Sequence, residues 1–337
     1  MTAPSIEPFS LPLSRPLETA GGTIETRRGF RIRIEIDGTP GVGEATPLSG
    51  WTESLDACES ALRSVDDPVS ALRGDQLRGT RAARHGVSLA VIDARARKAG
   101  LPLYRYLGAR ERVESVPANA TVGDGSSVET ADAACAAVRA GYPAVKVKIG
   151  AQAPAVDVER LESVRSTCPD VELRVDANGA WDETTADRLL PTLADLDIAV
   201  VEQPLSADRL REHSRLRDRG VEIALDESLV EHGVEAVIDA EAADVLVCKP
   251  MALGGIDVAR DVIETARTAG LDGLVTTTID GSIARAAAVH LAASVRGIRP
   301  CGLATGDLLA EDLTESIESV EEGAIAVPQG KGNIPPR

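Results

Sequence analysis

The chain has 337 residues, of which 43% are hydrophobic, so it can form one large domain and a smaller one around a substantial core. Its formal net charge of −17 argues against a surface that binds nucleic acid or anionic lipid. Five scattered cysteines without a Cys-x-x-Cys pair indicate neither a disulfide framework nor a zinc site. Because no signal peptide or long apolar run is present, the sequence favours a cytoplasmic protein that does not span a membrane.

Lysine is scarce: only five of the 36 basic residues are lysine, and the others are arginine. An acidic surface that carries arginine in place of lysine is typical of a protein soluble in concentrated salt, because clustered carboxylates stay hydrated. We therefore hypothesise a halophile-like surface, which a loss of solubility at high salt would contradict. The scarcity also draws attention to each lysine that remains.

Residues 1–112 have the pattern of a small α+β domain. Residues 31–36 alternate isoleucine with charged residues, as a half-buried antiparallel strand does, and a glycine-rich turn is expected at residues 38–43. Helices are expected over residues 54–65 and about 80–99. The acidic tail, residues 311–337, is expected to pack back on this domain, with its last residues frayed.

Residues 113–310 repeat short β-branched runs that are separated by segments with helical spacing. Successive runs begin 22 to 29 residues apart, which is enough for one strand, one helix and two loops. The runs cover residues 116–121, 144–149, 171–176, 198–202, 222–226, 244–249, 273–278 and 302–305. Eight such units predict an α/β fold with a parallel barrel inside a ring of helices. An open doubly wound sheet is the alternative, but its glycine-rich phosphate turn is missing after the first run.

Three of the five lysines lie at the ends of predicted strands. Lys146 and Lys148 close the second run, and side chains alternate in a strand, so both lysines point to one face. Since the outer helices need the apolar face, this lysine face must be directed toward the barrel axis. Lys249 ends the sixth run, and the same alternation directs it inward.

Three acidic residues end the intervening runs: Asp176, Glu202 and Asp226. The carboxyl ends of barrel strands form the rim at which active sites of this architecture lie. A single acid at such a position is commonly an N-cap for the next helix, but lysines and acids on successive strand ends that face one axis favour a catalytic site. Three converging carboxylates need a cation, and Mg²⁺ prefers oxygen ligands of this kind.

The lysines suggest proton transfer at carbon. A lysine acts as a base only in its neutral form, which a neighbouring cation favours, and Lys146 is placed to supply that cation to Lys148. Lys249 approaches from the opposite side of the barrel. The set suits removal of a proton alpha to a carboxylate, with the metal stabilising the enediolate. A noncatalytic barrel that binds divalent cations is the alternative outside enzymes, and it predicts that Lys148→Ala leaves function intact.

These motifs resemble the muconate-lactonising and mandelate-racemase-like side of the enolase superfamily. The resemblance rests on Lys-x-Lys at residues 146–148, Asp-Ala-Asn at 176–178, Glu-Gln-Pro at 202–204, Asp-Glu-Ser at 226–228 and Lys-Pro at 249–250. It covers nearly the whole chain and implies a (β/α)7β TIM-like barrel with an N-terminal α+β capping domain. Racemases, epimerases, cycloisomerases and dehydratases share these motifs, so they define the superfamily better than the reaction.

Residues 43–54, 276–283 and 302–308 resemble the o-succinylbenzoate synthases of menaquinone biosynthesis. That resemblance implies a carbon–oxygen lyase, in which Lys148 takes a proton from 2-succinyl-6-hydroxy-2,4-cyclohexadiene-1-carboxylate and assists hydroxide departure, while Lys249 stabilises the enediolate. Mg²⁺ would be held by Asp176, Glu202 and Asp226. Substrate contacts are expected from Trp51, Asn178, Thr277, Thr278 and Gly302. The chain has threonines where that family often has serines.

Other reactions of the superfamily remain open from the sequence. An N-acylamino acid racemase or dipeptide epimerase would use Lys148 and Lys249 as paired bases on opposite faces of the substrate, and a cycloisomerase is a third candidate. In each case the partner is a small-molecule carboxylate. The oligomeric state, including a homo-oligomer, is also left open.

Overall fold

The computed structural model describes residues 3–19, 22–314 and 320–334. Its first part is an antiparallel sheet of β1 (Ser5–Thr19), β2 (Gly22–Ile36) and β3 (Thr39–Ala45), in that order. Asp37 and Gly38 join β2 to β3, and both have positive φ angles, as the tightest hairpin turns require. The predicted turn over residues 38–43 is therefore too long, because the chain re-enters the sheet at Thr39.

The glycines that suggested a longer turn serve helix packing instead. A Cβ atom at Gly43 would lie 1.9 Å from the carbonyl oxygen of Gly86, which belongs to the helix α3 (Arg81–Ala99). Strand and helix backbones are thus in direct contact, which only glycine permits. The other helices of this part are α1 (Leu55–Arg63), α2 (Pro68–Arg73) and α4 (Leu103–Tyr106). The predicted helices over residues 54–65 and 80–99 are confirmed as α1 and α3.

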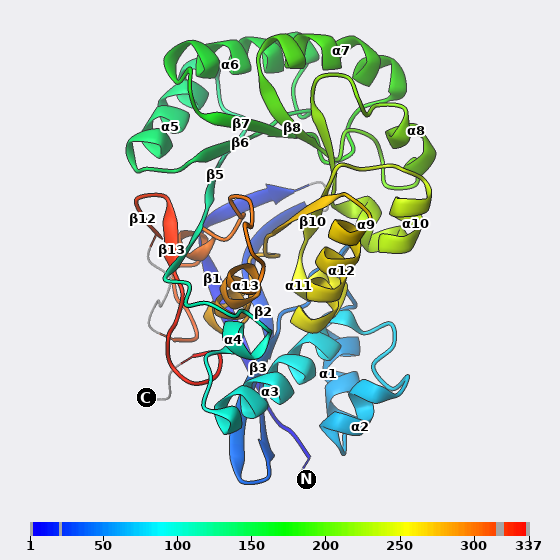
Figure 1. Cartoon of the computed structure of the whole chain (residues 1–337), viewed down its shortest axis with the longest axis vertical. Coiled ribbons are helices and arrows are strands. Elements are labelled where there is room, and N and C mark those ends of the chain that lie inside the picture. The colour runs from blue at the N-terminus through cyan, green and yellow to red at the C-terminus, as the bar shows by residue number, and fades with distance from the viewer. Residues whose placement is uncertain (1–2, 20–21, 315–319, 335–337) are drawn as a thin grey trace.

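A curved parallel sheet forms the larger part of the molecule (Figure 1). Within the described residues its order is β11-β10-β9-β8-β7-β6-β5. The strands are β5 (Asn119–Val122), β6 (Ala144–Lys148), β7 (Glu172–Asp176), β8 (Ile198–Glu202), β9 (Glu222–Leu225), β10 (Val245–Cys248) and β11 (Asp272–Val275). Each begins within a few residues of a predicted run, so the repeat that the sequence indicates is confirmed.

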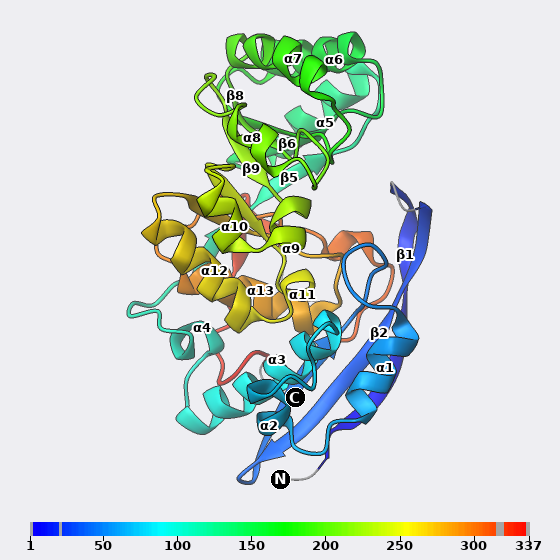
Figure 2. The same cartoon turned by 90° about the vertical axis from the view of Figure 1, so that its right-hand side faces the viewer.

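Helices follow the strands along the chain and cover the outer face of the sheet. They are α5 (Ser127–Arg139), α6 (Pro154–Thr167), α7 (Glu183–Asp195), α8 (Leu210–Ser214), α9 (Glu227–His232), α10 (Val234–Asp239), α11 (Pro250–Leu253), α12 (Ile256–Thr268) and α13 (Ser282–Ser294). Figure 2 shows α5, α6 and α7 at the end of the molecule away from α1 and α2, with β1 and β2 along one side. No helix in the described part of the chain is both long and apolar enough to cross a membrane.

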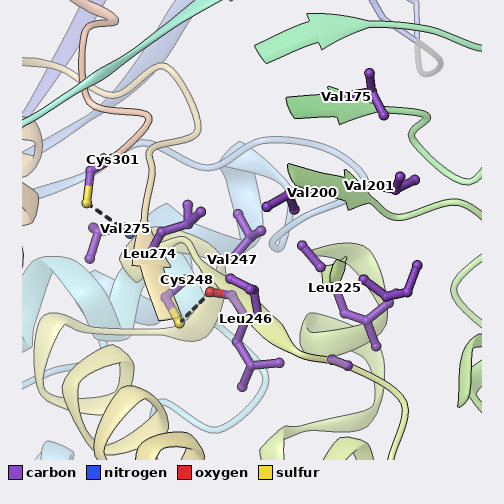
Figure 3. Close-up of a cluster of buried hydrophobic side chains, with 14 of the residues drawn as sticks. Val175, Val200, Val201, Leu225, Leu246, Val247, Cys248, Leu274, Val275 and Cys301 are labelled. Carbon is purple, nitrogen blue, oxygen red and sulfur yellow. Dashed lines mark hydrogen bonds between the residues drawn. The ribbon is translucent and has the colours of Figure 1, made fainter. Parts of the chain in front are cut away.

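The eighth predicted strand is reduced to a pair of bridging residues. Cys301 bridges to Ala118, just before β5, and Gly302 bridges to Thr276, just after β11. These contacts join the two edges of the parallel sheet. Figure 3 shows Cys301 in an apolar cluster with residues of several strands, and its sulfur accepts a hydrogen bond from the backbone nitrogen of Val275. The prediction of a strand over residues 302–305 was therefore displaced toward the C-terminus.

The first predicted run, residues 116–121, is divided between two sheets. Its first part belongs to β4 (Ser115–Pro117), which pairs with β13 (Ala324–Ala326), and β13 in turn pairs with β12 (Val320–Glu321). Its second part is β5. Pro117 has no N–H to continue a ladder, which accounts for a break at this point.

The described part of the tail contacts both regions of the molecule. Besides the pairing of β13 with β4, the backbone nitrogen of Asn333 donates to Asp93 at 2.6 Å, and Arg97 donates to the carbonyl of Ile334 at 2.6 Å. Asp93 and Arg97 belong to α3. The predicted fraying concerns residues 335–337, which lie outside the described residues.

Candidate active site

The strand register aligns the acidic residues on one rim of the parallel sheet. Lys148 pairs with Asp176 between β6 and β7, and Asp176 pairs with Glu202 between β7 and β8. Glu202 pairs with Ala224 in β9, and Asp226 follows two residues later. Because parallel strands in this register end at the same edge, three successive strands deliver a carboxylate to one place.

The three lysines bind these carboxylates directly. Lys146 Nζ lies 3.2 Å from Asp176 Oδ2 and 2.8 Å from Glu202 Oε2. Lys148 Nζ lies 2.6 Å from the same Asp176 oxygen, and Lys249 forms an ion pair with Asp226. The Lys148 side chain is 37% exposed, against 14% for Lys146 and 13% for Lys249. Lys148 is therefore the amine most accessible to a substrate.

Burial and neighbouring charges shift the pKa values of the three acids in different directions. Burial alone would raise the pKa of Asp176, but Lys146 and Lys148 outweigh it and hold that pKa well below the usual range. Burial, together with the charge on Asp176, raises the pKa of Glu202 to about 7. Burial also raises the pKa of Asp226 to about 6, against the opposing effect of Lys249. Glu202 and Asp226 thus keep raised pKa values although three lysines face the three acids, and a further cation would offset their burial and mutual repulsion.

Lys146 is held as a cation. Burial would lower its pKa, but the charges on Glu202 and Asp176 outweigh burial and raise that pKa above its usual value. Both oxygens of Glu202 accept a hydrogen bond from Lys146 Nζ. Lys146 therefore contributes positive charge, as its position in the sequence predicts.

Asp226 is not a helix cap, although it precedes α9. Its side chain makes no capping hydrogen bond, and its Oδ1 atom is buried without a hydrogen-bond partner. The buried side chain of Gln203 accepts hydrogen bonds from the backbone nitrogens of Asp226 and Ser228, at 3.1 Å each. Gln203 therefore fixes the backbone that carries Asp226. Sequence reasoning missed this role, although Gln203 stands in the Glu-Gln-Pro motif.

Asn178 contacts a lysine of the cluster. Its Oδ1 accepts a hydrogen bond from Lys148 Nζ at 2.7 Å, and its Nδ2 donates to Glu227 Oε1 at 3.2 Å. The other carboxylate oxygen of Glu227 is buried without a hydrogen-bond partner. Strand alternation would have directed Glu227 away from Asp226, but β9 ends at Leu225, so the alternation no longer holds there.

Trp51 reaches the same rim from the loop between β3 and α1. Its ring centroid lies 3.5 Å from Lys249 Nζ, which is a close cation–π contact. The loop closes on itself, since the backbone nitrogen of Trp51 donates to the carbonyl of Leu48 at 3.0 Å. Trp51, from which the resemblance predicts a substrate contact, thus lies over Lys249.

The remaining predicted contacts lie beyond the end of β11. Thr277 shares a hydrogen bond with Thr305 at 3.0 Å, Thr278 donates to Asp280 at 2.5 Å, and the Gly302 carbonyl accepts from Thr276 at 2.8 Å. In the part of the chain that the structure describes, no hydrogen bond or ion pair joins Thr277, Thr278 or Gly302 to the lysines or acids of the cluster.

A buried acid fastens the first part of the chain to this region. Glu44, in β3, accepts hydrogen bonds from the backbone nitrogens of Gly281 and Ala284 at the start of α13. Burial, with the nearby charge on Asp280, raises the pKa of Glu44 to about 7. Arg27 donates to the carbonyls of Thr46 and Ile279, so the base of the Trp51 loop is tied to the segment between β11 and α13.

The donor set fits a hard divalent cation in its chemistry. Asp176, Glu202 and Asp226 offer only oxygen, and Asp226 Oδ1 has no other partner. Among the described residues, no three histidine, cysteine or acidic side chains converge in a ready-made metal cage, because lysine amines lie against these carboxylates.

Two family models match most of the chain. Residues 129–333 match the model described as enolase C-terminal domain-like, and residues 6–108 match the N-terminal domain model of mandelate racemase and muconate lactonizing enzyme. The chain therefore belongs to the enolase superfamily, in its mandelate racemase and muconate lactonizing enzyme branch, and is an enzyme. The noncatalytic alternative is set aside by this membership.

Individual relatives cover most of the chain. The L-Ala-D/L-Glu epimerase of Bacillus subtilis is 32% identical over 86% of this chain and 84% of its own length. Muconate cycloisomerase 1-2 of Acinetobacter lwoffii is 31% identical over 96% of this chain and 89% of its own. The solved dipeptide epimerase of Methylococcus capsulatus, complexed with Mg and L-Arg-D-Lys, has a TM-score of 0.87 at 29% identity and covers 98% of both chains.

These findings confirm the predicted fold, and they support the predicted enzyme only as a member of the enolase superfamily. The predicted barrel with a capping domain matches the solved relative across 98% of both chains, so the open-sheet alternative was wrong. The relatives named above are epimerases and a cycloisomerase, so they do not support the resemblance to o-succinylbenzoate synthase, its lyase reaction or its place in menaquinone biosynthesis.

Proposed function

We propose that this enzyme is an isomerase that inverts the α-carbon of an amino acid residue in a dipeptide or a related N-acylated amino acid. The observation that carries the proposal is the placement of two amines on opposite sides of the carboxylate cluster. Lys148 ends β6 and Lys249 follows β10, with β7, β8 and β9 between them in the sheet. Inversion requires proton removal from one face of a carbon and proton return to the other.

In the proposed reaction, one lysine amine takes the α-proton and the ammonium group of the other lysine donates a proton to the opposite face. The enzyme then holds the same number of protons before and after, with the two lysines exchanged in protonation state. Lys146, held as a cation between Asp176 and Glu202, does not act as the base but stabilises negative charge in the site.

We propose that Asp176, Glu202 and Asp226 hold Mg²⁺, as their oxygen donors and the Mg in the Methylococcus capsulatus structure both support. When bound, the metal would neutralise charge that develops on the substrate carboxylate during proton removal. The unpartnered Oδ1 of Asp226 supports its place in this set.

Substrate contacts and domain boundaries belong to the same proposal. We propose that residues 1–112, with the tail 311–337, cap a barrel of residues 113–310, and that Trp51 closes over the substrate from the cap. Thr277, Thr278 and Gly302 would line the part of the substrate away from the reacting carbon. Asn178, which binds Lys148, would position that lysine as well as contact substrate.

The test is α-proton exchange in D₂O. Purified enzyme with Mg²⁺ is incubated with a panel of dipeptides that differ in both residues, and NMR follows loss of the α-proton signal and appearance of the epimer. We expect exchange and epimer formation for at least one dipeptide class. Lys148→Ala and Lys249→Ala should each abolish epimer formation, because each removes the amine that transfers a proton on one face of the α-carbon.

Parallel assays separate the rival reactions. If the cyclohexadiene carboxylate is dehydrated while no dipeptide or N-acylamino acid exchanges its α-proton, the enzyme is a lyase and the proposal is wrong. If muconate is lactonised instead, it is a cycloisomerase. Lys98→Ala is the control, because Lys98 is an exposed lysine paired with Asp37 at the cap surface, and its loss should leave exchange unchanged.

A further inference from the structure

Two cysteines that lie 33 residues apart in the chain are in direct contact on the outer layer of the barrel. The sulfur of Cys135, within α5, lies 2.6 Å from the sulfur of Cys168, the C-cap residue directly after α6. Figure 1 shows α5 and α6 side by side outside β6. Both thiols are free, and a disulfide would need only about 0.5 Å of further approach.

We propose that Cys135 and Cys168 form an oxidisable dithiol site, which a small-molecule disulfide converts into an intramolecular disulfide between α5 and α6. The thiolate of Cys135 attacks the small disulfide and releases one small thiol. Cys168 then attacks the sulfur of Cys135 and releases the second. Two protein thiols become one disulfide, and one small disulfide becomes two small thiols.

The surroundings of the two thiols fit these roles. Cys135 is half-buried, whereas Cys168 is 5% exposed, so Cys135 is the sulfur that a reagent in solution reaches first. Hydrogen bonds from Cys168 and Thr167 lower the pKa of Cys135, and burial raises the pKa of Cys168. Attack by Cys135 followed by resolution at Cys168 is the order that exposure and acidity both favour.

The other cysteines lack these features. Cys58, Cys248 and Cys301 are fully buried, and burial raises the pKa of each thiol. Oxidation is therefore confined to one pair, which lies on the helices that precede and follow β6. Since β6 carries Lys146 and Lys148, the cross-link would enclose the strand that supplies the proposed base, without touching the site itself.

The test treats the purified full-length protein with oxidised glutathione and measures intact mass, thiols in denaturant and a non-reduced peptide map. We expect a loss of two hydrogens, a fall from five thiols to three, and a peptide in which Cys135 is linked to Cys168. The linked protein should have a Tm about 5 °C higher, because the cross-link restricts the unfolded chain. Reduction should reverse all of these changes.

Variants separate this site from non-specific oxidation. Cys168→Ser should retain a glutathione adduct on Cys135, because the resolving thiol is missing, and Cys135→Ser should form neither adduct nor cross-link. Cys58→Ala, in the first part of the chain, should cross-link as the wild type does. A wild-type protein that keeps five thiols, or that carries a stable adduct on Cys135 with no linked peptide, would overturn the proposal.

Discussion

The two ends of the candidate site are bonded in different ways. At the ends of β6 to β10, each lysine binds an acid from another strand, so ion pairs link β6 to β7 and β8, and the end of β10 to the end of β9. Beyond β11, Thr278 bonds to a residue two positions away and Thr277 bonds to Thr305 of the next segment. The first end is therefore fixed by contacts between strands of the barrel, and the second by its own loops.

This difference suggests a division of work. Residues tied across strands cannot change without disturbing one another, which suits chemistry shared by a superfamily. Residues with local contacts can change with little effect on the barrel, which suits substrate choice. If the division holds, removing groups from the ionic cluster should abolish the reaction, whereas changes near β11 should alter which substrate is preferred.

Metal removal should have the largest effect. We expect EDTA to abolish α-proton exchange and added Mg²⁺ to restore it, because the site then lacks the cation that would neutralise charge developing on the substrate carboxylate. Activity at graded Mg²⁺ concentrations is the measurement. Asp226→Asn should raise the Mg²⁺ requirement by about 10²-fold, since it removes a charged ligand. Turnover that is unchanged in EDTA would show that the metal assignment is wrong.

Loss of a single lysine should come next. Lys148→Ala is expected to lower kcat for epimer formation by about 10³-fold or more, the range for loss of a general base. Far-UV circular dichroism should show an unchanged fold, because Lys148 is the most exposed of the three cluster lysines. A Lys148→Ala enzyme with wild-type kcat would contradict its role as a base.

The sequence predicts the barrel well because its strands are short β-branched runs with regular spacing. It missed β1, whose residues Pro8 and Pro12 are poor strand formers, although this edge strand pairs with β2 on both sides of an irregularity between Pro12 and Leu17. It also missed the division at Pro117, because the partner of β4 is β13, more than two hundred residues away. Pairing with distant segments is what local patterns cannot specify.

The candidate site likewise contains residues that local sequence patterns predict and residues that they do not. Strand alternation correctly groups the lysines and acids on one rim, since each lies in a strand or at its end. Gln203 and Glu227 lie just beyond the strands, where alternation no longer fixes direction, and their contacts appear only in three dimensions. The contact of Cys135 with Cys168 likewise depends on helix packing and has no signature in their spacing.

A smaller effect is expected where the cap meets the ionic cluster. Trp51→Ala should lower kcat/KM by about tenfold, because it removes a cation–π contact worth roughly 0.5–2 kcal/mol and exposes Lys249 to water. Trp51→Phe keeps an aromatic face and should recover most of that loss. Steady-state kinetics with one dipeptide substrate measures both. Equal losses for the two variants would show that the aromatic face is not what matters.

The smallest effect is expected at Thr277. This residue gives the sharpest test of whether residues beyond β11 set substrate preference while the ionic cluster carries out the reaction. Thr277→Val keeps the branched shape but removes the hydroxyl that bonds to Thr305. We expect kcat for the preferred dipeptide to change by less than about threefold, while kcat/KM ratios across the dipeptide panel shift by up to about tenfold, as the loss of one polar contact allows. Thr305→Val, which breaks the same bond from the other side, is the matched variant. A uniform fall in kcat for every substrate would instead show that Thr277 acts in proton transfer together with the ionic cluster.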